Sequence, residues 1–141
     1  MVNASDRGHG KLEALVKAKR LASYTIKITC NQKTFPVQYY NAITYKIIAI
    51  ATQIFMDAWE ANGIRVEDDE DKHKERHALQ DKAIRGCNNL LPLIQIAQEV
   101  FHLRLRRIEH WGRLILETRS ILKAWQESDD KRFTAHQVGV S

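Results

Sequence analysis

Arginine is the residue type whose spacing in this chain most clearly suggests chemistry. Arg104, Arg106 and Arg107 fall within four consecutive positions, and Arg113 and Arg119 follow in the same segment. A guanidinium group offers a fork of N–H donors that matches phosphate oxygens, and several together give binding that depends on salt and tolerates many sequences. The cluster therefore points to a polyanionic ligand, although pairing with nearby glutamates would make it an ordinary solvated surface.

The net charge of +5 is distributed unevenly along the chain. Residues 1–66 carry a net charge of +5, residues 67–101 carry −3, and residues 102–141 carry +3. If the first and last segments were neighbours in the fold, their basic side chains would form one surface. We therefore predict a nucleic-acid-binding surface made of Lys17, Arg20, Lys27, Arg104, Arg106, Arg107, Arg113 and Arg119.

Two histidines have a spacing that could hold a metal ion. His73 and His77 stand at i and i+4, which places both on one face of a helix. The glutamate of a zinc-protease helix would directly follow the first histidine, but Lys74 stands there, and no third ligand is evident. We therefore predict exposed helix surface here, with no metal site and no cofactor.

A ribonuclease-like pair is the remaining catalytic candidate. Arg104 and His110 lie six residues apart, which resembles the Arg-x4-6-His motif of the HEPN ribonucleases, themselves helical bundles. Leu105 stands where that motif usually has a polar residue. The chain has no glycine-rich phosphate loop and no Gly-x-Ser-x-Gly nucleophile elbow. We therefore predict no catalytic residue and keep a HEPN-like ribonuclease as an alternative.

Helical periodicity describes the elements that must position these residues. With 141 residues, 44% hydrophobic and only 6 Gly and 2 Pro, the chain suits one helical domain. Apolar residues at helical spacing predict helices over 11–31, 38–62, 67–101 and 105–127. The first stripe is Leu12, Leu15, Val16, Leu21, Ala22, Ile26 and Ile28.

Short breaks separate the four helices. Phe35-Pro36 ends the first, Gly63 closes the second, and the acidic run 67–71 suits the positive end of the third helix dipole. Pro92 predicts a kink in the third helix, and a short joint at 102–104 leads into the fourth. We predict an all-α antiparallel four-helix bundle over 11–128, with a flexible arm at 1–10 and a flexible tail at 129–141.

The chain carries no signal for secretion or for a membrane. Its polar N-terminus lacks the apolar core of a signal peptide, and no apolar run approaches the ~20 residues of a membrane helix. Cys30 and Cys87 are too few for a disulfide framework. We therefore expect a cytoplasmic protein with no membrane partner.

The order of these elements resembles a known family. The matching motifs are the second helix ending DAWEAN (57–62), the third carrying AIRGCNNLL (83–91), and the fourth with EHWG (109–112) and AW (124–125). Across residues 12–132 they are similar to the small four-helix-bundle family. This family includes the accessory variability determinant (Avd) proteins of diversity-generating retroelements and the proteins encoded in ribosomal RNA intervening sequences.

The resemblance implies a specific function. Avd-type proteins are non-enzymatic, assemble as homopentameric barrels with a basic surface, bind nucleic acid and associate with the reverse transcriptase of the element. They support the copying of template-repeat RNA into mutagenised cDNA. The expected partners are therefore RNA or DNA, a reverse transcriptase and further copies of this chain. The alternative from another class is an adaptor whose basic face docks an acidic protein.

Overall fold

The computed structural model describes residues 4–139, with side chains from Gly10 onward. It contains four long helices: α1 (Ala4–Thr29), α2 (Tyr45–Asn62), α3 (Glu70–Phe101) and α4 (Leu105–Gln137). Every regular element of the described residues is helical, so the prediction of an all-α helical bundle is confirmed.

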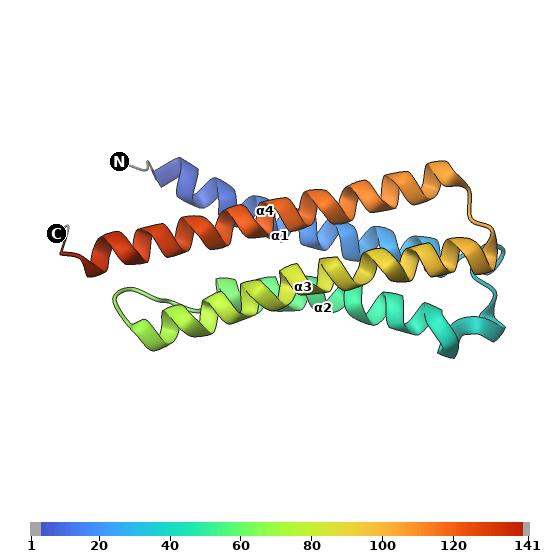
Figure 1. Cartoon of the computed structure of the whole chain (residues 1–141), viewed down its shortest axis with the longest axis horizontal. Helices are drawn as coiled ribbons and strands as arrows, with labels where there is room; N and C mark the ends of the chain where they lie inside the picture. Colours follow the sequence, from blue (N-terminus) through green and yellow to red (C-terminus); the bar gives the residue numbers. More distant parts are fainter. Residues whose placement is uncertain (1–3, 140–141) are drawn as a thin grey trace.

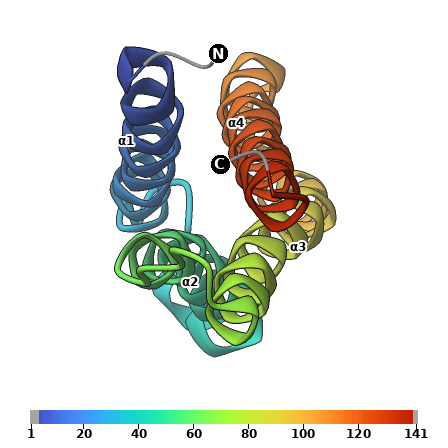
Figure 2. The ribbon, with the colours of Figure 1, turned by 90° about the vertical axis from the view of Figure 1, so that its left-hand side faces the viewer.

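The four helices lie side by side along the long axis of the molecule (Figure 1). The α1–α2 and α3–α4 connections share one end, and the α2–α3 connection lies at the other end with the beginning of α1 and the end of α4. Seen end-on, the helices form a ring in which α1 packs against α2 and α4, and α3 against the same two (Figure 2). α1 and α4 are therefore neighbours, as a shared basic surface requires.

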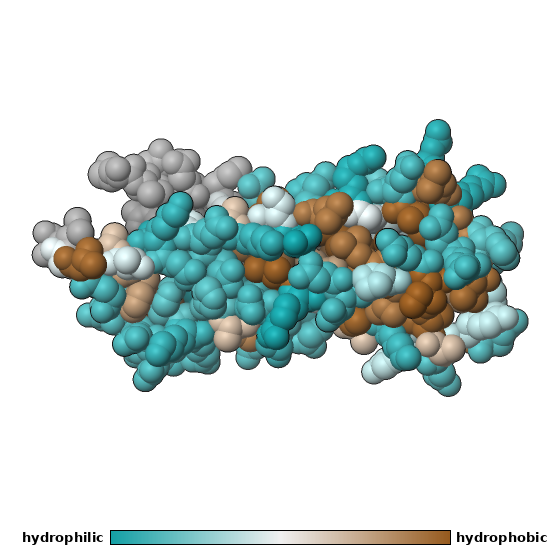
Figure 3. Space-filling model, in the orientation of Figure 1, coloured by the Kyte–Doolittle hydropathy of each residue, from teal (hydrophilic) through white to brown (hydrophobic). Residues whose placement is uncertain are grey.

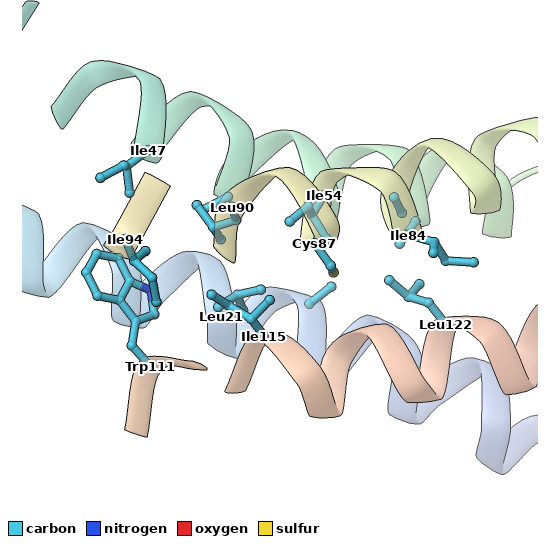
Figure 4. Close-up of a cluster of buried hydrophobic side chains, with 14 of the residues drawn as sticks. Leu21, Ile47, Ile54, Ile84, Cys87, Leu90, Ile94, Trp111, Ile115 and Leu122 are labelled. Atoms are coloured by element: carbon cyan, nitrogen blue, oxygen red, sulfur yellow. The ribbon is translucent and has the colours of Figure 1, made fainter. Parts of the chain in front are cut away.

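All four helices contribute to one apolar core. The ten labelled side chains in Figure 4 come from α1 (Leu21), α2 (Ile47, Ile54), α3 (Ile84, Cys87, Leu90, Ile94) and α4 (Trp111, Ile115, Leu122). The stripes predicted for the third and fourth helices keep their phase across several turns, and most of their residues are buried in this core. The third helix continues through Pro92 as a single element, as expected.

The first helix buries only part of the predicted stripe, namely Leu21, Ala22 and Ile28. Leu12, Val16 and Ile26 are exposed, whereas Ala14 and Ala18 are fully buried. Alanine side chains are small and let neighbouring helices approach closely. The helix therefore packs through Ala14 and Ala18 and leaves the larger residues beside them at the surface. Apolar surface also gathers on the half of the face in Figure 3 that holds the α3–α4 connection. Ile96 and Val100 at the end of α3 and Leu105 at the start of α4 are exposed apolar residues near this connection in the sequence.

The predicted domain limits differ from the observed helices. Residues 4–10, expected in a flexible arm, already belong to α1, and the rest of that arm lies outside the described residues. The fourth helix continues to Gln137 instead of ending near 128, because Asp129 is buried and bonded to α3. Of the tail predicted for 129–141, residues 129–137 are thus part of the bundle.

The connections follow local chemistry. Phe35 and Pro36 end the first hairpin connection, and a 3₁₀ turn (η1, Val37–Tyr39) and a π turn (η2, Tyr40–Thr44) precede α2 where a regular helix was predicted. Gly63 ends α2 with a φ of −77°, so the end of this helix does not require a left-handed backbone conformation. Asp69 caps α3, accepting hydrogen bonds from the backbone N–H groups of Asp71 and Lys72, as the acidic run suggested.

None of the helices described over residues 4–139 is long and apolar enough to cross a membrane.

Candidate nucleic-acid interface

The first turns of α4 form an open pocket against α1. Its volume is about 540 Å³, and it is open to solvent along the helix surface. Seven residues line it: Tyr24 from α1, with Arg104, Arg106, Arg107, Glu109, His110 and Arg113 from the start of α4. We call this the arginine pocket. It gathers four of the eight residues predicted to bind nucleic acid.

The charge of the arginine pocket is not neutralised from within. Among the residues of which the structure describes side chains, none forms a salt bridge with any of the four arginines. Glu109 is the single carboxylate in the lining. Arg104, Arg106 and Arg113 are exposed, and Arg107 is half-buried. Four cations so close to one another repel, and an anion between them would relieve that repulsion.

The start of α4 adds to this positive potential. Arg104 occupies the N-cap position, makes no side-chain capping bond and is followed by no acidic residue in the first turn. The start of α3 is the opposite case, with Asp69 as cap and Glu70 and Asp71 in the first turn. The free N–H groups and dipole of α4 therefore act in the same direction as the arginines.

The other predicted residues lie outside the arginine pocket. Lys17 donates to Glu117 over 3.3 Å, so its charge is partly compensated within the α1–α4 interface. Arg20 and Lys27 are exposed on α1. Arg119 is half-buried, and its Nε atom is buried without a hydrogen-bond partner among the described residues.

Arg119 lies near the core residue Cys87. Its charge lowers the pKa of Cys87, but burial has the larger opposite effect and raises this pKa to about 12. Arg119 therefore belongs to the core-facing part of α4, apart from the pocket.

Two aromatic rings in the arginine pocket were missed as binding residues. The rings of Tyr24 and His110 meet edge to face, with centroids 4.9 Å apart. Burial raises the pKa of Tyr24, and Arg107 opposes this with a smaller lowering effect, so the hydroxyl is neutral at physiological pH. A signal was present in the sequence, because Arg20, Tyr24 and Lys27 follow helical steps of four and three and so share a face.

A second polar cluster lies at the opposite end of the bundle. The Asp129 carboxylate accepts hydrogen bonds from Arg76 (Nε, 2.6 Å) and Gln80 (Nε2, 2.7 Å), and also pairs with Arg132. The Arg76 guanidinium lies over the Trp125 ring, 5.2 Å from its centroid. The bonds of Asp129 join α3 to α4. Because the cluster contains both positive and negative groups, it leaves little net charge to bind a ligand.

The histidines at metal-like spacing belong to the same end. Nε2 of His73 and Nδ1 of His77 lie 3.1 and 3.0 Å from one oxygen of Asp130, and the His73 ring stacks on Phe133. His73 is largely buried, unlike the exposed surface predicted for it. No group of three or more metal-binding side chains occurs in the part of the chain that the structure describes. These histidines help to hold the last turns of α4 against α3.

Comparison of the chain with protein-family models, with curated proteins and with solved structures found no match.

Proposed function

We propose that this protein is a non-enzymatic accessory subunit that binds nucleic acid through the arginine pocket. The observation that carries the proposal is the convergence of Arg104, Arg106, Arg107 and Arg113 on one open pocket with a single carboxylate. Arginine forks suit phosphate oxygens, and unpaired guanidinium groups keep their full charge for a ligand. Phosphate contacts of this kind position a strand without reading its sequence.

The resemblance to Avd-type proteins supplies the biological setting of the proposal. In that setting the protein acts in the cytoplasm with the reverse transcriptase of a diversity-generating retroelement and its template RNA, and supports mutagenic cDNA synthesis. It needs no cofactor for this role. Reconstitution of cDNA synthesis with and without this protein, on a template-repeat RNA, tests the setting.

Assembly into a homo-oligomeric barrel of antiparallel bundles, five copies by resemblance, is part of the same proposal. The exposed apolar residues Leu12, Val16 and Ile26 on α1 and Leu116 on α4 support it, since such side chains are often covered in an assembly. Sedimentation equilibrium measures the mass directly. A species of 16.3 kDa at all concentrations would contradict the assembly and leave the pocket proposal intact.

Charge reversal tests the binding function. We expect the double change Arg106→Glu and Arg107→Glu to weaken binding of labelled RNA and single-stranded DNA, and to lower the slope of log affinity against log salt by about two. The double change Lys123→Glu and Lys131→Glu is the matched control, because both lysines are exposed on α4 outside the arginine pocket. Equal losses in both variants would contradict the pocket as the binding surface.

Failure of the wild-type protein to bind either nucleic acid would favour the adaptor alternative. In that case the arginine pocket would dock an acidic protein partner instead.

One observation favours a second candidate, a HEPN-like ribonuclease. Arg104 and His110, the pair with the motif spacing, line the same pocket. Incubation of the wild-type protein with labelled RNA tests this activity. Cleavage that disappears in His110→Ala would support the ribonuclease, whereas intact RNA would support the non-enzymatic proposal.

A further inference from the structure

Tyr24 gives the arginine pocket a rigid aromatic base. Its ring meets the ring of Trp111 edge to face at 6.4 Å as well as that of His110. Trp111 is fully buried, and its Nε1 atom donates a hydrogen bond to Thr25 Oγ1 over 3.0 Å. The exposed His110 ring therefore packs on a series of edge-to-face ring contacts that extends into the core, and this limits the conformations of its side chain.

The position of His110 between two arginines is set by helix geometry. Arg106, His110 and Arg113 stand at i, i+4 and i+7, so they follow one another along one face of α4. At 1.5 Å per residue, Arg106 and Arg113 are about 10 Å apart along the helix axis, with the imidazole ring between them. The order along this face is cation, aromatic ring, cation.

A single-stranded nucleic acid offers the complementary order of phosphate, base and phosphate. Its bases are free to splay out and stack on aromatic side chains, whereas duplex bases have both faces covered by their neighbours. Arginine contacts to phosphate do not by themselves favour the single strand, because a duplex carries two phosphate backbones and a higher charge density. Discrimination must therefore come from the ring.

We propose that the arginine pocket prefers single strands to duplexes, with one unpaired base stacked on His110 and the flanking phosphates held by Arg106 and Arg113. This inference rests on the proposed nucleic-acid-binding function and adds the class of nucleic acid. Stacking has no strong base preference, since every base has a π face. The preference is therefore one of form and not of sequence.

The test compares a labelled oligothymidine with a blunt duplex of the same length, by fluorescence anisotropy on the full chain. We expect His110→Ala to weaken binding of the single strand about tenfold and to leave binding of the duplex unchanged. His110→Phe should restore the single-strand affinity, because it keeps an aromatic ring but cannot carry the charge or proton of an imidazole. Since His110 is exposed, neither change threatens the fold.

Variants of the arginines distinguish the stacking inference from the proposed nucleic-acid-binding function. Arg106→Ala and Arg113→Ala should weaken binding of single strand and duplex alike. If they do so while His110→Ala binds the single strand as the wild type does, the stacking inference is overturned and the proposed function stands. Equal losses of both ligands in His110→Ala would also overturn the inference. Absence of any binding by the wild-type protein would overturn both.

Discussion

At the scale of single residues, the two cysteines show how burial sets reactivity. Cys87 is fully buried and Cys30 is exposed. Burial raises the pKa of Cys87 to about 12, so its thiol stays protonated at physiological pH and reacts poorly, because the thiolate is the nucleophile. We predict that a thiol reagent at pH 8 labels one cysteine in the native protein and two after denaturation. The variant Cys30→Ser should show no native labelling, and rapid labelling of it would contradict the burial of Cys87.

Asp129 is the residue whose loss should cost the most stability. The residue is 8% exposed and its carboxylate is bonded to Arg76 and Gln80, so Asp129→Ala would leave the buried Gln80 amide N–H without a partner and the largely buried Arg76 guanidinium without its carboxylate. We predict a fall in the free energy of unfolding of about 3 kcal/mol, measured by chemical denaturation. Glu127→Ala, at an exposed position two residues away, should change it by less than about 0.5 kcal/mol. Similar values for the two variants would contradict the role of this cluster.

At the scale of helices, alanine substitutions at two glycines are expected to change the unfolding free energy in opposite directions. A methyl group on Gly86 in α3 would stand 2.6 Å from Cγ1 of Ile54 in α2, whereas one on Gly112 in α4 would meet nothing within 4 Å. Gly86→Ala should therefore lower the unfolding free energy by about 1–3 kcal/mol, and Gly112→Ala should raise it by about 0.5–1 kcal/mol through its better helix propensity. Thermal unfolding of the two single variants gives the comparison. Stabilisation by Gly86→Ala would contradict the close α2–α3 contact.

The helices differ in how much of their packing could be predicted. In α3 and α4 the apolar residues repeat strictly, so their buried faces followed from the spacing. In α1 large apolar residues lie on several faces, and alanines make up much of the buried face beside Leu21 and Ile28, so the hydrophobic signal is weak. Arg76, Gln80 and Asp129 continue the α3 and α4 stripes in phase. Because polar residues were assumed to face solvent, the end of α4 was placed too early.

The arginine pocket was predictable only in part. The sequence contains the arginines, and their crowding already suggested an anion. The separation of Arg113, which lines the pocket, from Arg119, which faces the core, depends on the rotation of α4 against its neighbours. The contribution of Tyr24 depends on the contact between α1 and α4 across many intervening residues. Both are products of tertiary packing, which local spacing does not encode.

At the scale of the whole molecule, charge is separated along the bundle axis. The arginine pocket lies at the start of α4, and the acidic run 67–71 lies in and after the α2–α3 connection at the opposite end (Figure 1). The 33 residues of α4 extend over about 50 Å, many times the Debye length of about 8 Å at physiological salt.

Neutralising the distant acids should therefore have little effect at physiological salt. We predict that Glu67→Gln with Asp68→Asn, both outside the cap of α3, changes nucleic-acid affinity less than about twofold there. In 0.01 M salt, where the Debye length is about 30 Å, the same variant should associate faster than the wild type. Stopped-flow association rates at the two salt concentrations provide the measurement. A large gain in affinity at physiological salt would show that the ligand reaches the acidic end.

We propose that the first turns of α4, with Tyr24 from α1, contact nucleic acid. Backbone amide chemical-shift mapping during titration with a short oligothymidine tests it most directly, because it reports on every part of the bundle at once. We predict that the largest shifts fall on residues 105–113 and on Tyr24, with residues 70–76 and 129–133 unchanged. Shifts confined to the Asp129 end, with none at the arginine pocket, would contradict the claim.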